Sequence, residues 1–235
     1  MGQKNYREER QQMTANGRIG QYVLQMLKEN YEVNEISLGS DAKLDKGLMH
    51  FTVNRYDVKD IGNLCLLNMT GIFGLMKMET VVLSCFTKDV PLVNFDTVDA
   101  MGNRTQIAEF YDTRIAADNA LLAETCQAIK DGDADIPDYV SGEHWYDSLL
   151  YPYSYAKKTK GKNPRTETSC LKYADAFMEE LQRAEACDPA AKKEKIRSFA
   201  QSLLDNGGPA VNQMRKMFGE EIAKRLVLQH MYGAE

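Results

Sequence analysis

The stretch VPLVNFDTV, residues 90–98, places a carboxylate in the middle of an apolar strand pattern. Strand side chains alternate between two faces, so Asp96 shares its face with every second residue. Those residues are Leu92, Asn94 and Val98. Asp is unusual inside a strand because its charge is costly to bury. Either this is an edge strand with Asp96 in water, or burial raises the pKa of Asp96 enough for it to act as a general acid.

Short extended segments surround residues 90–98 and predict an antiparallel sheet. Turn residues such as Asp60-Ile61-Gly62 and Met101-Gly102-Asn103 separate these segments. Connections this short join antiparallel neighbours, so the strands form a meander. The predicted strands are residues 48–57, 63–71, 75–86, 90–98 and 104–111.

Helical periodicity frames this meander on both sides. The predicted helices are residues 5–30, 114–130, 167–186 and 189–204, with a last helix ending near Tyr232. Three polar stretches between elements are predicted as connections, namely residues 31–47, 131–142 and 157–165. The expected architecture is one domain over residues 1–235, with an antiparallel sheet and helices outside it.

Composition narrows the class of protein. The chain has 235 residues, of which 43% are hydrophobic and 27% charged, as in ordinary globular proteins. Its net charge of −5 gives no general attraction to nucleic acid, so we expect no nucleic-acid partner. No apolar run is long enough to span a bilayer, so we expect no membrane partner either. Five scattered cysteines without a CxxC pair indicate reduced thiols in a cytoplasmic protein.

The sequence carries no motif for a metal, a nucleophile or a nucleotide. Its three histidines, His50, His144 and His230, lie too far apart for a ligand or triad spacing to be recognised. Gly71-Ile72-Phe73-Gly74 is too short for a dinucleotide fingerprint and opens no helix.

Two stretches are unusual in composition. HWYDSLLYPYSY, residues 144–155, holds five aromatic residues, which either line a flat conjugated ligand or cover the sheet as core. KKTKGKNPR, residues 157–165, gathers positive charge on an acidic protein. It is either a solvated loop or a docking patch for an acidic partner.

Three local patterns, in order along residues 48–232, resemble the ferredoxin-dependent bilin reductases. Residues 90–98, followed by the Gly102 turn and QIAEFYD at 106–112, are similar to a family strand that reads Leu-Pro-Leu-Phe-Gly-x-Asp-Ile-Val. MRKMFGEEIAKRL at 214–226 looks like the closing helix of the family, and VNRY at 53–56 is the third pattern.

The resemblance implies a three-layer α/β/α sandwich with a central antiparallel sheet flanked by helices. It implies a tetrapyrrole ligand between the sheet and the C-terminal helices, no bound cofactor, and electrons from reduced ferredoxin or flavodoxin. Asp96 then matches the central proton donor of the family, and Asn68 and Asp205 are possible helpers. Val82 stands where some members have His. The implied dock for the electron donor is Lys157, Lys158, Lys160, Lys162 and Arg165.

Three functions remain open at this stage. The chain is a reductase of a linear tetrapyrrole or a related conjugated molecule, or it binds a tetrapyrrole or heme without catalysis. The third possibility is a divergent protein that kept the core of this fold and lost the pocket.

Overall fold

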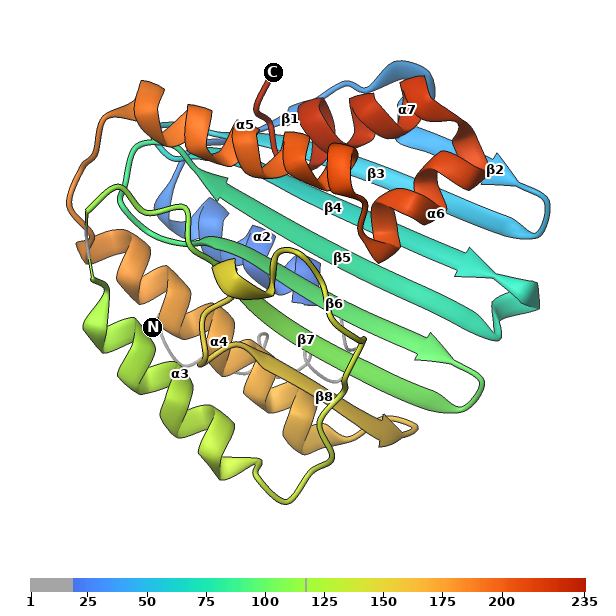
Figure 1. Ribbon diagram of the computed structural model, residues 1–235, viewed down its shortest axis with the longest axis horizontal. Helices are drawn as coiled ribbons and strands as arrows, with labels where there is room; N and C mark the ends of the chain where they lie inside the picture. Colours follow the sequence, from blue (N-terminus) through green and yellow to red (C-terminus); the bar gives the residue numbers. More distant parts are fainter. Residues whose placement is uncertain (1–18, 117) are drawn as a thin grey trace.

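An antiparallel sheet forms the centre of the protein (Figure 1). The computed structural model describes residues 19–116 and 118–235. Within them the strand order is β1-β3-β4-β5-β6-β7-β8, and β2 pairs with β3 beside β1. The strands are β1 (Val33–Ile36), β2 (Lys43–Lys46), β3 (Met49–Val58), β4 (Gly62–Gly71), β5 (Met76–Cys85), β6 (Leu92–Ala100), β7 (Asn103–Tyr111) and β8 (Tyr155–Lys160).

Helices cover both faces of this sheet, which gives the three layers expected from the sequence (Figure 1). One face packs against α2 (Ile19–Asn30), α3 (Ala120–Gly132) and α4 (Pro164–Arg183). The other face packs against α5 (Pro189–Asn206), α6 (Pro209–Phe218), α7 (Glu220–Arg225) and a π-helical turn, η4 (Leu226–Met231). Single 3₁₀ turns lie at η1 (Gly39–Ala42), η2 (Ile72–Gly74) and η3 (Asp147–Leu149). None of the described helices is long and apolar enough to cross a membrane.

The predicted meander is confirmed, because β3 to β7 follow one another as antiparallel neighbours. The alternation in β6 is confirmed as well. Val93 and Phe95 belong to the core under α2 and α4, whereas Leu92 belongs to the core under the C-terminal helices. Asp96 therefore points toward the C-terminal helices.

Two predicted connections and one predicted helix start are wrong. Residues 31–47 contain β1 and β2, which are four residues each and mostly exposed, so no apolar alternation revealed them. Residues 157–160 belong to β8, which completes the sheet beside β7. The helix expected from residue 114 begins at Ala120. Residues 5–18 of the predicted first helix lie outside the described residues.

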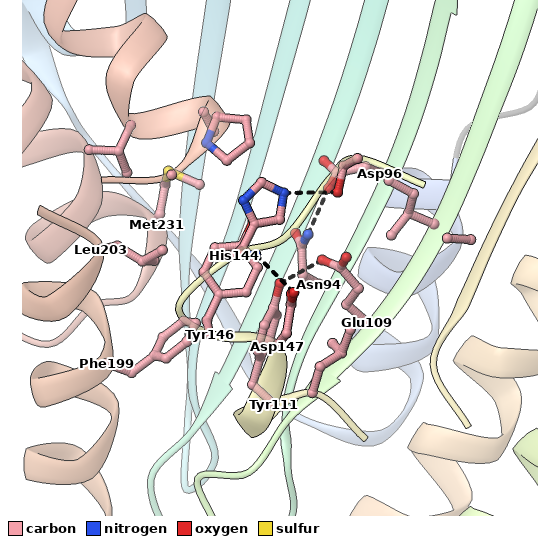
Figure 2. Close-up of a pocket in the computed structure, with 18 of the residues that line it drawn as sticks. Asn94, Asp96, Glu109, Tyr111, His144, Tyr146, Asp147, Phe199, Leu203 and Met231 are labelled. Carbon is pink, nitrogen blue, oxygen red and sulfur yellow. Dashed lines mark hydrogen bonds between the residues drawn. The ribbon is translucent and has the colours of Figure 1, made fainter. Parts of the chain in front are cut away.

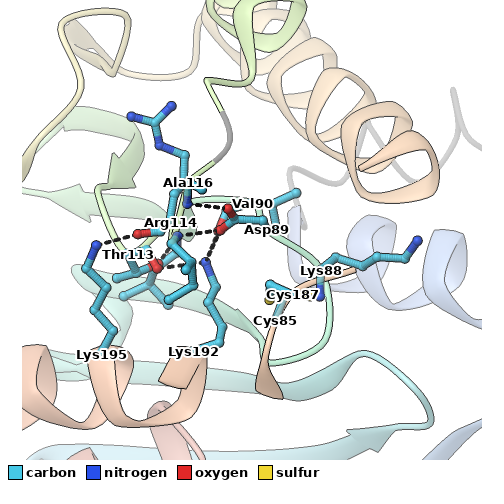
Figure 3. A network of polar contacts seen from close by, with 12 residues as sticks. Cys85, Lys88, Asp89, Val90, Thr113, Arg114, Ala116, Cys187, Lys192 and Lys195 are labelled. Atoms are coloured by element: carbon cyan, nitrogen blue, oxygen red, sulfur yellow. Dashed lines mark hydrogen bonds and ion pairs between the residues drawn. The ribbon is translucent and has the colours of Figure 1, made fainter. Parts of the chain in front are cut away.

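A buried ion pair explains why α3 begins late (Figure 3). Asp89 accepts hydrogen bonds from the backbone N–H groups of Ile115 and Ala116, over 2.6 and 2.7 Å. Lys192 of α5 is fully buried, and its Nζ lies 3.6 Å from Asp89. The same Nζ donates to the carbonyl oxygens of Val90 and Thr113, over 2.5 and 2.8 Å. This network ties residues 113–116 to Asp89 and to α5, ahead of the first residue of α3.

Candidate functional site

A cavity of about 360 Å³ lies between the sheet and the C-terminal helices (Figure 2). Strands β6 and β7 form its floor, the loop of residues 139–147 forms one wall, and α5, α6 and η4 close the opposite side. This volume falls within the range of small-molecule sites, about 300–1,000 Å³. The cavity therefore brings the middle of the sheet and the last third of the chain to one place.

Asp96 lies on the floor of this cavity and is half-buried. Burial raises the pKa of Asp96 above its ordinary value, and hydrogen bonds from Thr80 and Asn94 oppose that rise. The Thr80 hydroxyl donates to Oδ1 of Asp96, and Nδ2 of Asn94 donates to Oδ2 over 2.6 Å. Both donors hold the carboxyl in one orientation, while desolvation favours its protonated form.

Glu109 is a second carboxyl on the same floor. It lies on β7 opposite Asn94, so it projects from the same face of the sheet as Asp96. Burial raises the pKa of Glu109 to about 7, and the nearby charge of Asp96 adds to the rise. The hydroxyl of Tyr111 donates to Oε2 of Glu109 over 2.6 Å. Burial also raises the pKa of Tyr111, so this hydroxyl remains a donor at neutral pH.

Asn94 lies between the two carboxyls and has an unused acceptor. Its Nδ2 is bonded to Asp96, and its side chain also bonds Glu109. Its Oδ1 is buried and accepts no hydrogen bond. A buried polar atom without a partner is costly, so this oxygen favours a bound donor such as a ligand N–H.

Aromatic side chains from three parts of the chain meet at the cavity. Tyr146 contacts Tyr111 edge to face, with 5.9 Å between ring centroids. His144 stacks on Tyr146 at 5.0 Å with an interplanar angle of 14°. The wall is fixed from outside the cavity, because the indole N–H of Trp145 donates to the carbonyl of Gly207 over 2.7 Å. Such flat, mostly apolar walls suit a conjugated ligand.

Both alternatives for residues 144–155 are thus partly correct. His144 and Tyr146 line the cavity. Tyr153 and Tyr155 instead belong to the core on the opposite face of the sheet. The segment passes around the edge of the sheet at β8. Its first half therefore lies on the side of the cavity, and its second half packs on the side of α3 and α4.

The electrostatic character of the cavity is acidic. Asp96, Glu109 and Asp147 line it, and no Lys or Arg of the described residues does. Within residues 19–116 and 118–235, no group of three or more His, Cys, Asp or Glu side chains is arranged to hold a metal ion. A ligand of this site meets hydrogen-bond acceptors on the floor and aromatic rings on the wall.

The two expected helpers of Asp96 are not in the cavity. Asn68 pairs with Glu79 on β5, next to the pair of Leu67 and Thr80, which shares the face of Asp96. Neighbouring residues of a strand point to opposite faces, so the side chain of Asn68 points away from the cavity. There it lines a separate polar pocket. Asp205 is exposed near the end of α5 and bonds Gln201 over 2.8 Å. Val82 does share the face of Asp96, in the apolar core under the C-terminal helices.

The basic stretch is only partly available to a partner. Lys157 is buried, and its Nζ bonds the carbonyl of Ile136 and the carboxylate of Asp138, over 2.9 and 2.7 Å. Arg165 lies in the first turn of α4 and forms ion pairs with Asp133 and Asp135. The exposed lysines of the stretch are Lys158, Lys160 and Lys162. Of the five residues of the expected dock, Lys157 and Arg165 thus form ion pairs within the protein, and the docking role of the stretch stays a prediction.

Glu109 was not among the residues that the sequence singled out. The turn at residues 101–102 fixes the pairing of residues 92–100 with residues 103–111, and this register places Glu109 diagonally across from Asp96. Counting outward from that turn would have found Glu109. His144 opens the aromatic stretch of residues 144–155, but a loop without regular pairing carries it, so the sequence could not place it relative to Asp96.

Comparisons with known proteins identify the fold. No family model and no curated protein matches the sequence. The crystal structure of phytochromobilin synthase from tomato, solved in complex with biliverdin, is similar at a TM-score of 0.75. The likeness covers 91% of this chain and 81% of that chain at 11% sequence identity. The chain is thus an α/β/α sandwich with a central antiparallel sheet, as the sequence predicted, and it shares this fold with the phytochromobilin synthase structure.

Proposed function

We propose that the cavity binds a linear tetrapyrrole or a related conjugated molecule and delivers protons to it during a ferredoxin-dependent reduction. The observation that carries this proposal is the pair of carboxyl groups with raised pKa, Asp96 and Glu109, on the floor of an aromatic cavity. The solved structure with this fold and bound biliverdin supports the ligand class. We also propose that the chain is a divergent member of the bilin reductases and works as one domain over residues 1–235.

The two carboxyls match the proton requirement of the reaction. Reduction of one double bond consumes two electrons and two protons, and ferredoxin delivers its electrons one at a time. Asp96 gives its O–H proton to the ligand radical formed by the first electron and becomes a carboxylate. Glu109 supplies the second proton after the second electron, and solvent restores both acids. A carboxyl titrating near neutral pH is suited to this role.

The acidic floor also orients the ligand. Pyrrole and lactam N–H groups can donate to Asp96 and to the open Oδ1 of Asn94. The propionates of a tetrapyrrole would meet no Lys or Arg among the residues that line the cavity, so they point out of it. Lys158 lies on that side, with its Nζ 5.9 Å from the ring of the lining residue Tyr139.

The electron donor is proposed to be a reduced ferredoxin or flavodoxin. Lys158, Lys160 and Lys162 remain exposed on and beside β8, one edge of the sheet whose floor carries the carboxyls. An acidic donor protein would be attracted there despite the net charge of −5.

A binding protein for a tetrapyrrole or heme is the second candidate. His144 in the cavity wall favours it, because an imidazole can ligate heme iron. The position of Val82, which cannot transfer a proton, also fits binding without reduction.

Absorbance titrations test binding first. Biliverdin and hemin are titrated separately into the protein, and a saturable spectral shift is expected for the true ligand. Ala156→Trp would fill the cavity from β8 and abolish the shift, whereas Leu121→Trp on the exposed face of α3 would preserve it. No shift with either ligand, or an equal shift in both variants, would reject this cavity as the tetrapyrrole site.

A further inference from the structure

The exposed large hydrophobic residues gather at one end of the sheet, which we call the apolar end. Nine such side chains are exposed among the described residues, and five of them lie in three turns. Figure 1 shows these turns, β2–β3, β4–β5 and β6–β7, at the same end of the sheet. The five residues are Leu48, Ile72, Phe73, Leu75 and Met101.

Hydrogen bonds join these turns into one continuous surface. The N–H of Ile72 donates to the carbonyl of Leu48 over 3.3 Å. Met76 pairs with Ala100, which brings the second turn beside the third. The N–H of Gly161 donates to the carbonyl of Gly102 over 2.8 Å, so the segment after β8 joins the same end.

Stability alone does not explain this surface. Phe73 is 89% exposed and Met101 is 92% exposed. Ile72, Phe73 and Met101 also adopt φ angles of 52°, 56° and 51°, in the left-handed region that favours Gly and Asn. Backbone strain of this kind concentrates at functional sites. The turns therefore hold apolar side chains in water at a conformational cost.

Lysines surround the apolar end. Lys46, Lys77, Lys160 and Lys162 are all exposed and lie within three residues of a turn or at the end of β8. Of the nearby carboxylates, Asp99 is paired with Arg104, and Asp45 is hydrogen-bonded to the ring of His50 over 2.8 Å. This end is basic on a chain whose net charge is −5.

We propose that the apolar end contacts an anionic phospholipid surface. Phe73, Leu75 and Met101 enter the interfacial region, and the lysines meet the phosphate groups. Separate apolar residues on separate turns suit a fluid surface better than a close-packed protein interface. Lysines act as hydrated point charges, whereas protein recognition of phosphate or carboxylate more often uses the planar fork of Arg.

This proposal replaces the expectation of no membrane partner. That expectation rested on the lack of a spanning segment, and a peripheral contact needs none. The proposal does not depend on the ligand of the cavity, because none of the five apolar residues lines it.

Vesicle sedimentation with the full chain tests the apolar contact. Vesicles of phosphatidylcholine containing phosphatidylglycerol are expected to bind the protein, and vesicles of phosphatidylcholine alone to bind at least tenfold less. The double variant Phe73→Asn/Met101→Asn should bind the anionic vesicles at least tenfold more weakly. Asn accepts the left-handed conformation, so its thermal midpoint should be equal or higher. Leu121→Asn, on exposed α3, is the control and should bind as the wild type does.

Charge reversal tests the second half of the proposal. Lys77→Glu/Lys162→Glu should weaken binding to the anionic vesicles about tenfold or more, and Lys224→Glu on α7 should leave it unchanged. The proposal would be overturned if both double variants bound the anionic vesicles as tightly as the wild type, or if the wild type did not bind them at all. Self-association or capture of an acidic protein that is lost in Phe73→Asn/Met101→Asn, with no vesicle binding, would assign the surface to a protein partner and overturn it equally.

Discussion

Replacing Glu109 by Gln should change how stability depends on pH. The folded state raises the pKa of Glu109 from an ordinary value of 4.5 to about 7. Between these values the folded state binds more protons than the unfolded state, so stability falls as pH rises. The variant lacks this titration and keeps a side chain of similar size that can still bond Tyr111.

The size of this effect follows from the pKa difference. A shift from 4.5 to about 7 corresponds to about 3 kcal/mol at roughly 1.36 kcal/mol per pH unit. Glu109 is half-buried, and solvent screening reduces this to about 2 kcal/mol. Glu109→Gln should therefore equal the wild type in stability near pH 4.5 and exceed it by about 2 kcal/mol at pH 8.

Urea unfolding at pH 4.5, 6 and 8 measures the difference directly. Glu124→Gln, an exposed substitution on α3, serves as the control and should follow the wild type at every pH. If Glu109→Gln also follows the wild type from pH 4.5 to pH 8, then Glu109 is not held in a desolvated cavity and the reasoning about the floor is refuted.

Three further predictions concern two buried charged groups and one exposed turn residue. Lys192→Met leaves the carbonyls of Val90 and Thr113 without the Lys192 donor and should lower the free energy of unfolding by about 3 kcal/mol. Urea unfolding measures this loss, and an unchanged urea midpoint would contradict the network. Asp41 bonds Arg225, which lowers the pKa of that carboxyl to about 2, so its stabilisation is present above pH 4 and lost as pH falls toward 2. Asp41→Asn should thus cost about 1 kcal/mol at pH 7 and nothing at pH 2, and equal losses at both would refute the pairing. Phe73→Asn should relieve a left-handed φ angle, which raises the free energy of unfolding by about 1 kcal/mol and raises the thermal midpoint. A lower thermal midpoint in this variant would show that the backbone of Phe73 is not strained.

The sequence predicted the meander because its strands obey simple local rules. Residues 90–98 alternate cleanly, and Gly and Asp mark the turns, so the neighbours of each strand followed directly. The short strands β1 and β2 escaped because each has four mostly exposed residues and shows no alternation of apolar and polar residues. β8 escaped because its lysines suggested a loop, although the aliphatic stem of Lys157 is buried and its charge is paired.

The candidate site was predictable only in part. The position of Asp96 followed from the strand pattern together with a family resemblance. Asn68 was misplaced because a shift of one residue in register moves a side chain to the other face. The roof of the cavity depends on how α5 and α6 pack onto the sheet, and nothing local in residues 189–218 fixes that packing. Glu109 needed only the pairing across the turn at Gly102.

Anaerobic reduction of bound biliverdin tests the central claim most directly. Reduced ferredoxin is added to the protein–biliverdin complex, and the loss of the long-wavelength absorbance is followed for the wild type and for Asp96→Asn. The account predicts bleaching by the wild type and a rate at least about 100-fold lower in the variant, with biliverdin still bound. Equal bleaching by both proteins would contradict the role of Asp96 as proton donor, and bound biliverdin that never bleaches would favour a binding protein instead.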